Sequence, residues 1–251
     1  MTTFTSADDL AGAKFLGVDL RGARFRAVTL TGVVMRAMEV DDVEIDAPWL
    51  IESGASFVVN GVDVTPLVDA ELDRRFPGRE LRGASDPAGL REAWRAVERT
   101  WEATCARVAA MPAGTVDVSV AGEWSFAETL RHLVMATDTW LRKAILQEPQ
   151  PYHPIGRPDS SFGGGDEDPS VFSTTDPTYE EVLAVRAERV AMVRDLLATV
   201  TPELLAEERR NPHDDRYPET VLSCLRTILE EEWEHHRYAV RDLDAIEAGA
   251  A

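Results

Sequence analysis

Residues 229–243 read LEEEWEHHRYAVRDL, a run of good helix formers that contains three consecutive acids and two adjacent histidines. A carboxylate and a histidine four residues apart lie on the same face of a helix, close enough together to bind one metal ion. Two such pairs occur in this run, Glu231 with His235 and Glu232 with His236. The run therefore predicts a helix in which one of these pairs supplies two ligands to a metal site.

A third ligand is expected from His132, which lies in a second helical stretch, WSFAETLRHLVMATDTWL at residues 124–141. Together with either pair, His132 completes a set of two histidines and one carboxylate. This set suits zinc, nickel or iron and leaves coordination positions open for water or substrate. Of the three ions, we expect zinc.

The two pairs differ in where they lie around their helix. At about 100° per residue, Glu232 and His236 fall in the middle of the apolar stripe, where an unpaired carboxylate is costly. Glu231 and His235 fall on one flank of that stripe. His132 lies on the same-sense flank of its own helix, and such flanks face each other when two helices are antiparallel neighbours. We therefore expect the metal ligands His132, Glu231 and His235, with the second pair as the alternative.

Four amphipathic helices are predicted in the second half of the chain from apolar residues that recur at intervals of three and four. A capping box from Ser125 to Glu128 opens the second helix, and Pro218 opens the fourth. The link between the second and third helices, residues 148–177, is long enough for these two helices to run parallel. We expect an up-down-down-up four-helix bundle, with helices at residues 88–110, 125–147, 178–200 and 218–246.

The N-terminal part of the chain repeats every five residues. Nine positions from Leu10 to Leu50 at this interval are all apolar, and a second row that begins at Gly12 is rich in glycine. Five is neither the helix period nor the strand period, but it fits coils that turn a corner every five residues and bury their inward rows by stacking. The pattern resembles the pentapeptide-repeat family, which implies a short right-handed, four-sided β-helix over about residues 7–50.

Together the patterns predict an α+β protein of two domains. The first, residues 1–76, is a pentapeptide-repeat β-solenoid with a capping helix that Thr65 and Pro66 open, and its expected role is stability or interaction. Residues 77–87 have the composition of a linker. Residues 88–251 are expected to form the four-helix bundle.

The charge of the chain limits its partners. The sequence has 26 Lys and Arg against 45 Asp and Glu, a net charge of −19, so we expect no nucleic-acid partner and no binding to an anionic membrane. The sequence has no run of 18 apolar residues and no signal-peptide pattern at its start. Cys105 and Cys224 form no CxxC pair and are expected as free thiols in a cytoplasmic protein.

The bundle resembles the DinB-like four-helix bundles over about residues 88–247. The resemblance rests on W-S-x-x-E-x-x-x-H-L in the second helix and on the Glu/His cluster followed by R-D-L in the last. The run EEWEH that starts at Glu231 also resembles the E-x-W-x-H motif of the mycothiol-dependent maleylpyruvate isomerase type. The better-known DinB pattern has H-x-x-x-H followed by R-G-Q, and Glu232 stands where its first histidine would be, so the alternative pair stays open.

This resemblance implies a divalent metal that activates the sulfur of a small-molecule thiol, such as mycothiol or bacillithiol. The implied activity is that of a metal-dependent thiol S-transferase or isomerase acting on an electrophilic substrate. The alternative is a non-catalytic DinB-like bundle that carries a pentapeptide-repeat interaction module. The exposed faces of such a bundle are compatible with a homodimer.

Five other side chains lie in or near the motifs. Arg237 and Arg241 are expected to pair with acids of their own helix rather than to bind a carboxylated substrate. Trp124 and Trp140 are candidates both for walls of the pocket and for core packing. His153, in the proline-rich link, is a less favoured candidate for reaching the site.

Overall fold

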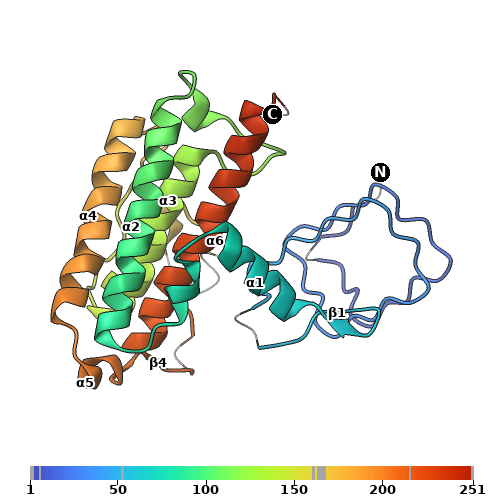
Figure 1. Ribbon diagram of the computed structural model, residues 1–251, viewed down its shortest axis with the longest axis horizontal. Coiled ribbons are helices and arrows are strands. Elements are labelled where there is room, and N and C mark those ends of the chain that lie inside the picture. The colour runs from blue at the N-terminus through green and yellow to red at the C-terminus, as the bar shows by residue number, and fades with distance from the viewer. Residues whose placement is uncertain are drawn as a thin grey trace. The chain divides into compact units, whose positions relative to one another are not determined.

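The structure of the chain is a computed structural model that describes residues 3–5, 7–51, 54–159, 162, 168–214 and 216–249. The chain divides into two units, Met1–Asp46 and Ala47–Ala251. The second unit is mostly helical, and each strand among the described residues is only two residues long (Figure 1). The helical domain of the predicted fold is therefore present.

The first unit keeps the five-residue period in its backbone. The dihedral angle φ is positive at every fifth residue from Gly12 to Asp42, which is the row that is rich in glycine. Glycine adopts positive φ without steric cost, so this row suits the corners of a coil. The amides of Ala13, Ala23 and Val33 each bond to the carbonyl three residues earlier, at 2.9–3.1 Å. A turn thus recurs every ten residues.

The apolar row of this unit is not buried. Its members from Leu10 to Ile45 are 44–65% exposed. Among the described residues, no strand precedes Val58. The backbone therefore follows the predicted period, whereas the closed four-sided β-helix stays a prediction.

The second unit opens with a hairpin and a helix. Strands β1 (Val58–Val59) and β2 (Val62–Asp63) pair in antiparallel register. The turn between them, Asn60-Gly61, has positive φ at both residues (50° and 83°), as a two-residue hairpin turn requires. Helix α1 (Thr65–Arg75) follows. Thr65 was expected to cap this helix, but its hydroxyl instead accepts a hydrogen bond from the amide of Phe57 in the hairpin (3.0 Å).

The stretch expected as a linker contains ordered structure. A 3-10 helix, η1 (Arg79–Gly83), follows α1 directly. The Arg79 side chain is 2% exposed and pairs with Asp69 (2.7 Å) and Asp73 (2.5 Å) of α1. Gly78 has φ of 100°, and a Cβ there would lie only 2.8 Å from the Cβ of Ala96, so η1 packs closely on the bundle. Composition alone did not reveal these contacts, because they depend on how α1 and the helix that contains Ala96 fold back against this stretch.

Four long helices form the bundle (Figure 1). They are α2 (Pro87–Ala109), α3 (Phe126–Thr137) with its π-helical continuation η3 (Asp138–Ile145), α4 (Tyr179–Thr199) and α6 (Val221–Glu247). The predicted capping box is formed: Ser125 accepts from the amide of Glu128, and Glu128 accepts from that of Ser125. The shorter elements are η2 (Thr115–Asp117), η4 (Pro169–Val171), α5 (Pro202–Leu205), β3 (Glu208–Arg209) and β4 (Glu219–Thr220).

The last helix starts later than predicted. Glu219 and Thr220 form β4 and pair with β3 in antiparallel register, which removes them from the helix. Thr220 then caps α6 by accepting a hydrogen bond from the amide of Ser223 (3.0 Å). Pro218 therefore lies outside the helix that it was expected to open.

The directions of the helices agree with the predicted bundle. Phe126 at the start of α3 packs on Tyr179 at the start of α4, with ring centroids 6.3 Å apart. Farther along, Asp138 binds Arg189 of α4 (2.8 Å), so α3 and α4 run parallel. The colour order in Figure 1 shows that α2 and α6 run the opposite way. The result is the expected up-down-down-up order.

The apolar stripes of the helices meet in the core. Trp94, Leu130, Leu225 and Leu243, all from predicted stripes, are at most 2% exposed. Each such buried side chain contributes about 1.5–3 kcal/mol, so the stripes hold the bundle together. Within the part of the chain that the structure describes, no helix combines the length and the apolar character needed to cross a bilayer.

Candidate metal centre

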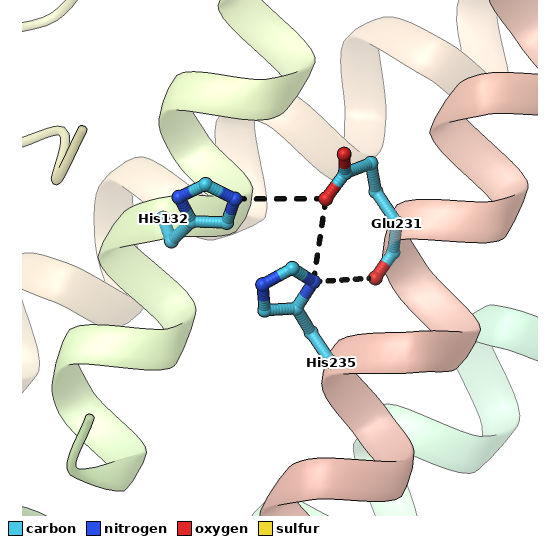
Figure 2. Close-up of side chains that lie close together, drawn as sticks. All are labelled: His132, Glu231 and His235. Carbon is cyan, nitrogen blue, oxygen red and sulfur yellow. Dashed lines mark hydrogen bonds and ion pairs between the residues drawn. The ribbon is translucent and has the colours of Figure 1, made fainter. Parts of the chain in front are cut away.

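Three predicted ligands come together between α3 and α6. His132 projects from the middle of α3 toward Glu231 and His235 on α6 (Figure 2). An oxygen of the Glu231 carboxylate lies 3.5 Å from Nε2 of His132 and 3.3 Å from Nδ1 of His235. The three residues offer ligand atoms that all lie within 4.8 Å of one another, so the group could hold a metal ion.

Main-chain carbonyls orient both imidazoles. Nδ1 of His132 lies 3.0 Å from the carbonyl oxygen of Arg157, and Nδ1 of His235 lies 2.9 Å from that of Glu231. A carbonyl oxygen only accepts, so each Nδ1 carries a proton, and in the neutral imidazole Nε2 then keeps its lone pair. Metal-binding histidines are commonly held in this way by their other ring nitrogen.

This arrangement brings two acceptors face to face. When His132 is neutral, with its proton on Nδ1, it directs the lone pair of Nε2 at a carboxylate oxygen of Glu231. Two such acceptors repel each other unless a proton or a metal ion lies between them. The donor set therefore fits a divalent cation, with one oxygen and two nitrogens as ligands.

The electrostatic setting keeps the ligands in their metal-binding forms. Burial by itself would raise the pKa of Glu231, but the interaction with His132 and the charge that His235 can carry outweigh it and lower that pKa below its ordinary value. Burial and the neighbouring His132 lower the pKa of His235 to about 4. At neutral pH the carboxylate is therefore ionised and the His235 imidazole neutral, as metal binding requires.

Trp124 lies against the candidate site. The sequence predicted it either as a wall of the pocket or as a core residue, and its position agrees with the first role. Its ring centroid lies 4.7 Å from that of His132 and 6.2 Å from that of His235, to which it is nearly parallel. The guanidinium of Arg157 lies over the Trp124 ring, 5.8 Å from its centroid, and pairs with Glu128 (3.1 Å). Trp124 thus covers both imidazoles with apolar surface.

Two other candidates lie elsewhere. The ring of Trp140 contacts that of His213 (5.5 Å). His153 donates its amide to the carboxylate of Asp138 (2.8 Å), and its Nδ1 accepts from the amide of Ile155 (3.2 Å). The structure therefore does not bring Trp140 or His153 to the three ligands.

The alternative pair faces another side of α6, turned by about 100° from the first pair. Glu232 is 1% exposed and forms an ion pair with Arg186 of α4. His236 is 5% exposed, and its Nε2 lies 2.8 Å from the hydroxyl of Thr104 on α2. Neither residue belongs to the group that includes His132. The sequence placed both in the core stripe but missed the partners that make burial acceptable.

The two arginines of the motif pair with acids of their own helix, as expected. Arg237 binds Glu234 (2.8 Å), and Arg241 binds Asp242 (2.7 Å). Both guanidinium groups also lie over the ring of Tyr238, at 4.4 Å and 5.1 Å from its centroid. Their charge is thus compensated on the helix itself.

The long link before α4 contributes to the site in a way that the sequence did not predict. Arg131, the neighbour of His132, donates to the carbonyls of Ile155 (2.8 Å) and Thr174 (2.7 Å) and so holds two parts of the link against α3. The link thereby brings the carbonyl oxygen of Arg157 within hydrogen-bond distance of Nδ1 of His132. A contact made by a main-chain carbonyl has no side-chain signature, so no pattern in the sequence could have revealed it.

The comparisons with known proteins agree with the bundle. A family model described as the DinB superfamily matches residues 96–239, which is more than half of the 251 residues of the chain. The match includes all three residues of the candidate metal centre. No curated protein and no solved structure gives a significant match to the chain.

Proposed function

The chain belongs to the DinB superfamily, and on this premise we propose that His132, Glu231 and His235 bind one divalent metal ion in its bundle. The observation that carries the proposal is the convergence of three donor atoms from two helices, with both Nδ1 atoms held by carbonyls. Zinc is the ion that we expect, and nickel and iron suit the same donors.

The activity that we propose is that of a metal-dependent thiol S-transferase or isomerase. The bound ion would lower the pKa of a small-molecule thiol, such as mycothiol or bacillithiol, so that its sulfur attacks an electrophilic substrate. Support comes from the E-x-W-x-H motif that starts at Glu231. Further support comes from the protein's own thiols, since burial raises the pKa of Cys105 and raises that of Cys224 to about 12. The nucleophile would therefore come from outside the chain.

The residues of the chain would orient and shield the reacting thiol. The Arg157 and Glu231 carbonyls keep the two imidazoles turned toward the ion. Trp124 covers one side of both rings and excludes water there. The side chains of Glu231 and His235 are each 14% exposed, and an incoming thiol would approach the ligands from that edge.

A second candidate function is a non-catalytic bundle with a pentapeptide-repeat interaction module. The observation that favours it is the apolar row from Leu10 to Ile45, which is 44–65% exposed. Exposed apolar surface of this extent usually marks an interaction site. In this case the apolar row of the first unit would contact a partner, and the bundle would serve binding or homodimer formation.

Metal analysis of protein purified without a histidine tag separates the two candidates. The metal-centre proposal expects about one equivalent of zinc after purification, or after incubation with zinc or nickel and dialysis. Less than about a tenth of an equivalent under all these conditions would overturn it. The assay of choice for the activity is then thiol-dependent conversion of a model electrophile, with and without a chelator.

A further inference from the structure

Directed contacts tie the core face of α6 to two neighbouring helices. Both carboxylate oxygens of Glu232 lie 2.5 Å from Nη2 of Arg186 on α4. Nε2 of His236 lies 2.8 Å from the hydroxyl of Thr104 on α2. That hydroxyl donates its one proton to the carbonyl of Thr100 (3.0 Å), so His236 donates and Thr104 accepts. One ion pair and one hydrogen bond therefore hold α6 from two sides.

These contacts stand next to the ligands of the proposed metal centre. Glu232 and His236 each follow a ligand, Glu231 or His235, by one residue. In a rigid helix, a rotation of about 10° displaces an atom about 6 Å from the axis by about 1 Å, whichever face the atom lies on. Metal–ligand distances tolerate only about 0.2 Å. The rotation of α6 about its own axis therefore decides whether both ligands reach the ion that His132 binds.

Apolar packing alone would define this rotation loosely, because hydrophobic contacts are not directional. A buried ion pair and a buried hydrogen bond are directional and weaken when donor and acceptor turn apart. We propose that Arg186, with Thr104 as a second contact, is a positioning residue that fixes the rotation of α6 and so places the metal ligands. This inference rests on the metal centre proposed above and adds the residues that orient it.

The test replaces the whole ion pair with apolar residues, Arg186→Met together with Glu232→Met. Such a replacement leaves no buried charge and often preserves or raises stability. The readouts are the zinc dissociation constant, from competition with a chromophoric chelator, and the urea midpoint of the metal-free protein. We expect the dissociation constant to rise about tenfold to a hundredfold, as for other residues that orient metal ligands, without a matching fall in the midpoint.

A matched control removes a second buried arginine from α4. Arg189 binds Asp138 (2.8 Å), and the two side chains are 6% and 0% exposed. Asp138 keeps Arg142 (3.4 Å) and the amide of His153 (2.8 Å) as partners. Since Arg189 contacts no residue of α6 in these pairs, Arg189→Met alone should leave the zinc dissociation constant unchanged. An equal rise in the control would overturn the positioning role, because general loosening of the bundle would then explain both results.

Two variants of Thr104 provide a test that removes no charge. Thr104→Val deletes the acceptor for His236 and should raise the zinc dissociation constant, whereas Thr104→Ser keeps the hydroxyl and should not. Equal zinc dissociation constants for these two variants would contradict the positioning role of Thr104. An unchanged constant in the Arg186/Glu232 variant of a zinc-binding protein would overturn the positioning role alone. A wild type that binds no zinc would overturn the metal centre and the positioning role with it.

Discussion

The two faces of α6 carry the same residue types in opposite settings. Glu232 and His236 face α4 and α2, where each meets a partner of complementary chemistry, a guanidinium or a hydroxyl. Glu231 and His235 face α3, where the carboxylate of Glu231 lies beside two imidazoles that can each offer Nε2 to a cation. The difference teaches that burial alone does not identify a ligand. A polar group that the protein itself satisfies maintains the fold, whereas acceptors gathered together are suited to an added ion.

Removal of one imidazole from each face should have the largest effect. His235→Ala deletes one of three donors and should abolish zinc uptake, whereas His236→Ala should still bind about one equivalent at saturating zinc. Metal analysis after dialysis of the untagged proteins measures both. The reverse result would move the site to Glu232 and His236 and break the comparison between the faces.

Removal of a single charge should lower the free energy of unfolding when the charge contacts the core face of α6, but not when it belongs to the candidate metal centre. Arg186→Met leaves the buried carboxylate of Glu232 without its cation, which costs about 3–5 kcal/mol. Glu231→Gln should change the free energy of unfolding of the metal-free protein by less than about 1 kcal/mol. Urea denaturation monitored by tryptophan fluorescence compares the two. Equal losses would show that both faces maintain the fold.

Acid should destabilise the fold, and His236 on the core face should contribute to this loss. Burial lowers the pKa of His236 to about 4, below its value of about 6.5 in an unfolded chain. Between these values the unfolded chain binds a proton that the folded chain does not, so the free energy of unfolding falls as the pH is lowered from about 6.5 to about 4.

The contribution of His236 can be isolated by comparison with His236→Phe. Urea titrations of the metal-free proteins at pH 6.5 and 4.5 should show that the variant loses about 2 kcal/mol less than the wild type. The pKa of His235 is also lowered to about 4 and acts in the same direction in both proteins, so it cancels in the difference. Identical pH dependence would mean that His236 is not held neutral by burial.

The smallest effect is expected from the exposed part of α6. Arg241 is 38% exposed and pairs with Asp242 at the surface. Arg241→Ala should therefore change the free energy of unfolding by less than about 1 kcal/mol and leave zinc binding unchanged. If the same variant loses thiol-dependent turnover at unchanged stability, Arg241 belongs to substrate binding instead.

Much of the helical fold could be predicted because its signals are local. Helices expected at 88–110 and 178–200 are Pro87–Ala109 and Tyr179–Thr199. Apolar stripes and caps lie within a few residues of each other in the sequence, so they mark helices closely. The same geometry separated two ligand pairs that differ by one residue, since one residue turns a helix by about 100°.

The rest depends on contacts between distant parts of the chain. The pairing of Arg186 with Glu232 requires knowledge of which helix faces which, and the pairing of Glu219 with Arg209 shortened the last helix. In the first unit, the five-residue period predicted the backbone turns but not the exposure of the apolar row, because the burial of that row depends on how successive coils stack.

Helix α6 contains two acid–histidine pairs that are offset by one residue, Glu231 with His235 and Glu232 with His236. This offset affects what the loss of one residue would do to the helix. Deletion of Glu230 would turn the following part of the helix by about 100° and bring Glu232 and His236 to the positions of the present ligands. The side facing α3 would again hold an acid and a histidine, while Trp233 and Arg237 would take the places next to α4 and α2. A one-residue deletion would thus preserve an acid and a histidine as metal donors but would lose the contacts with Arg186 and Thr104.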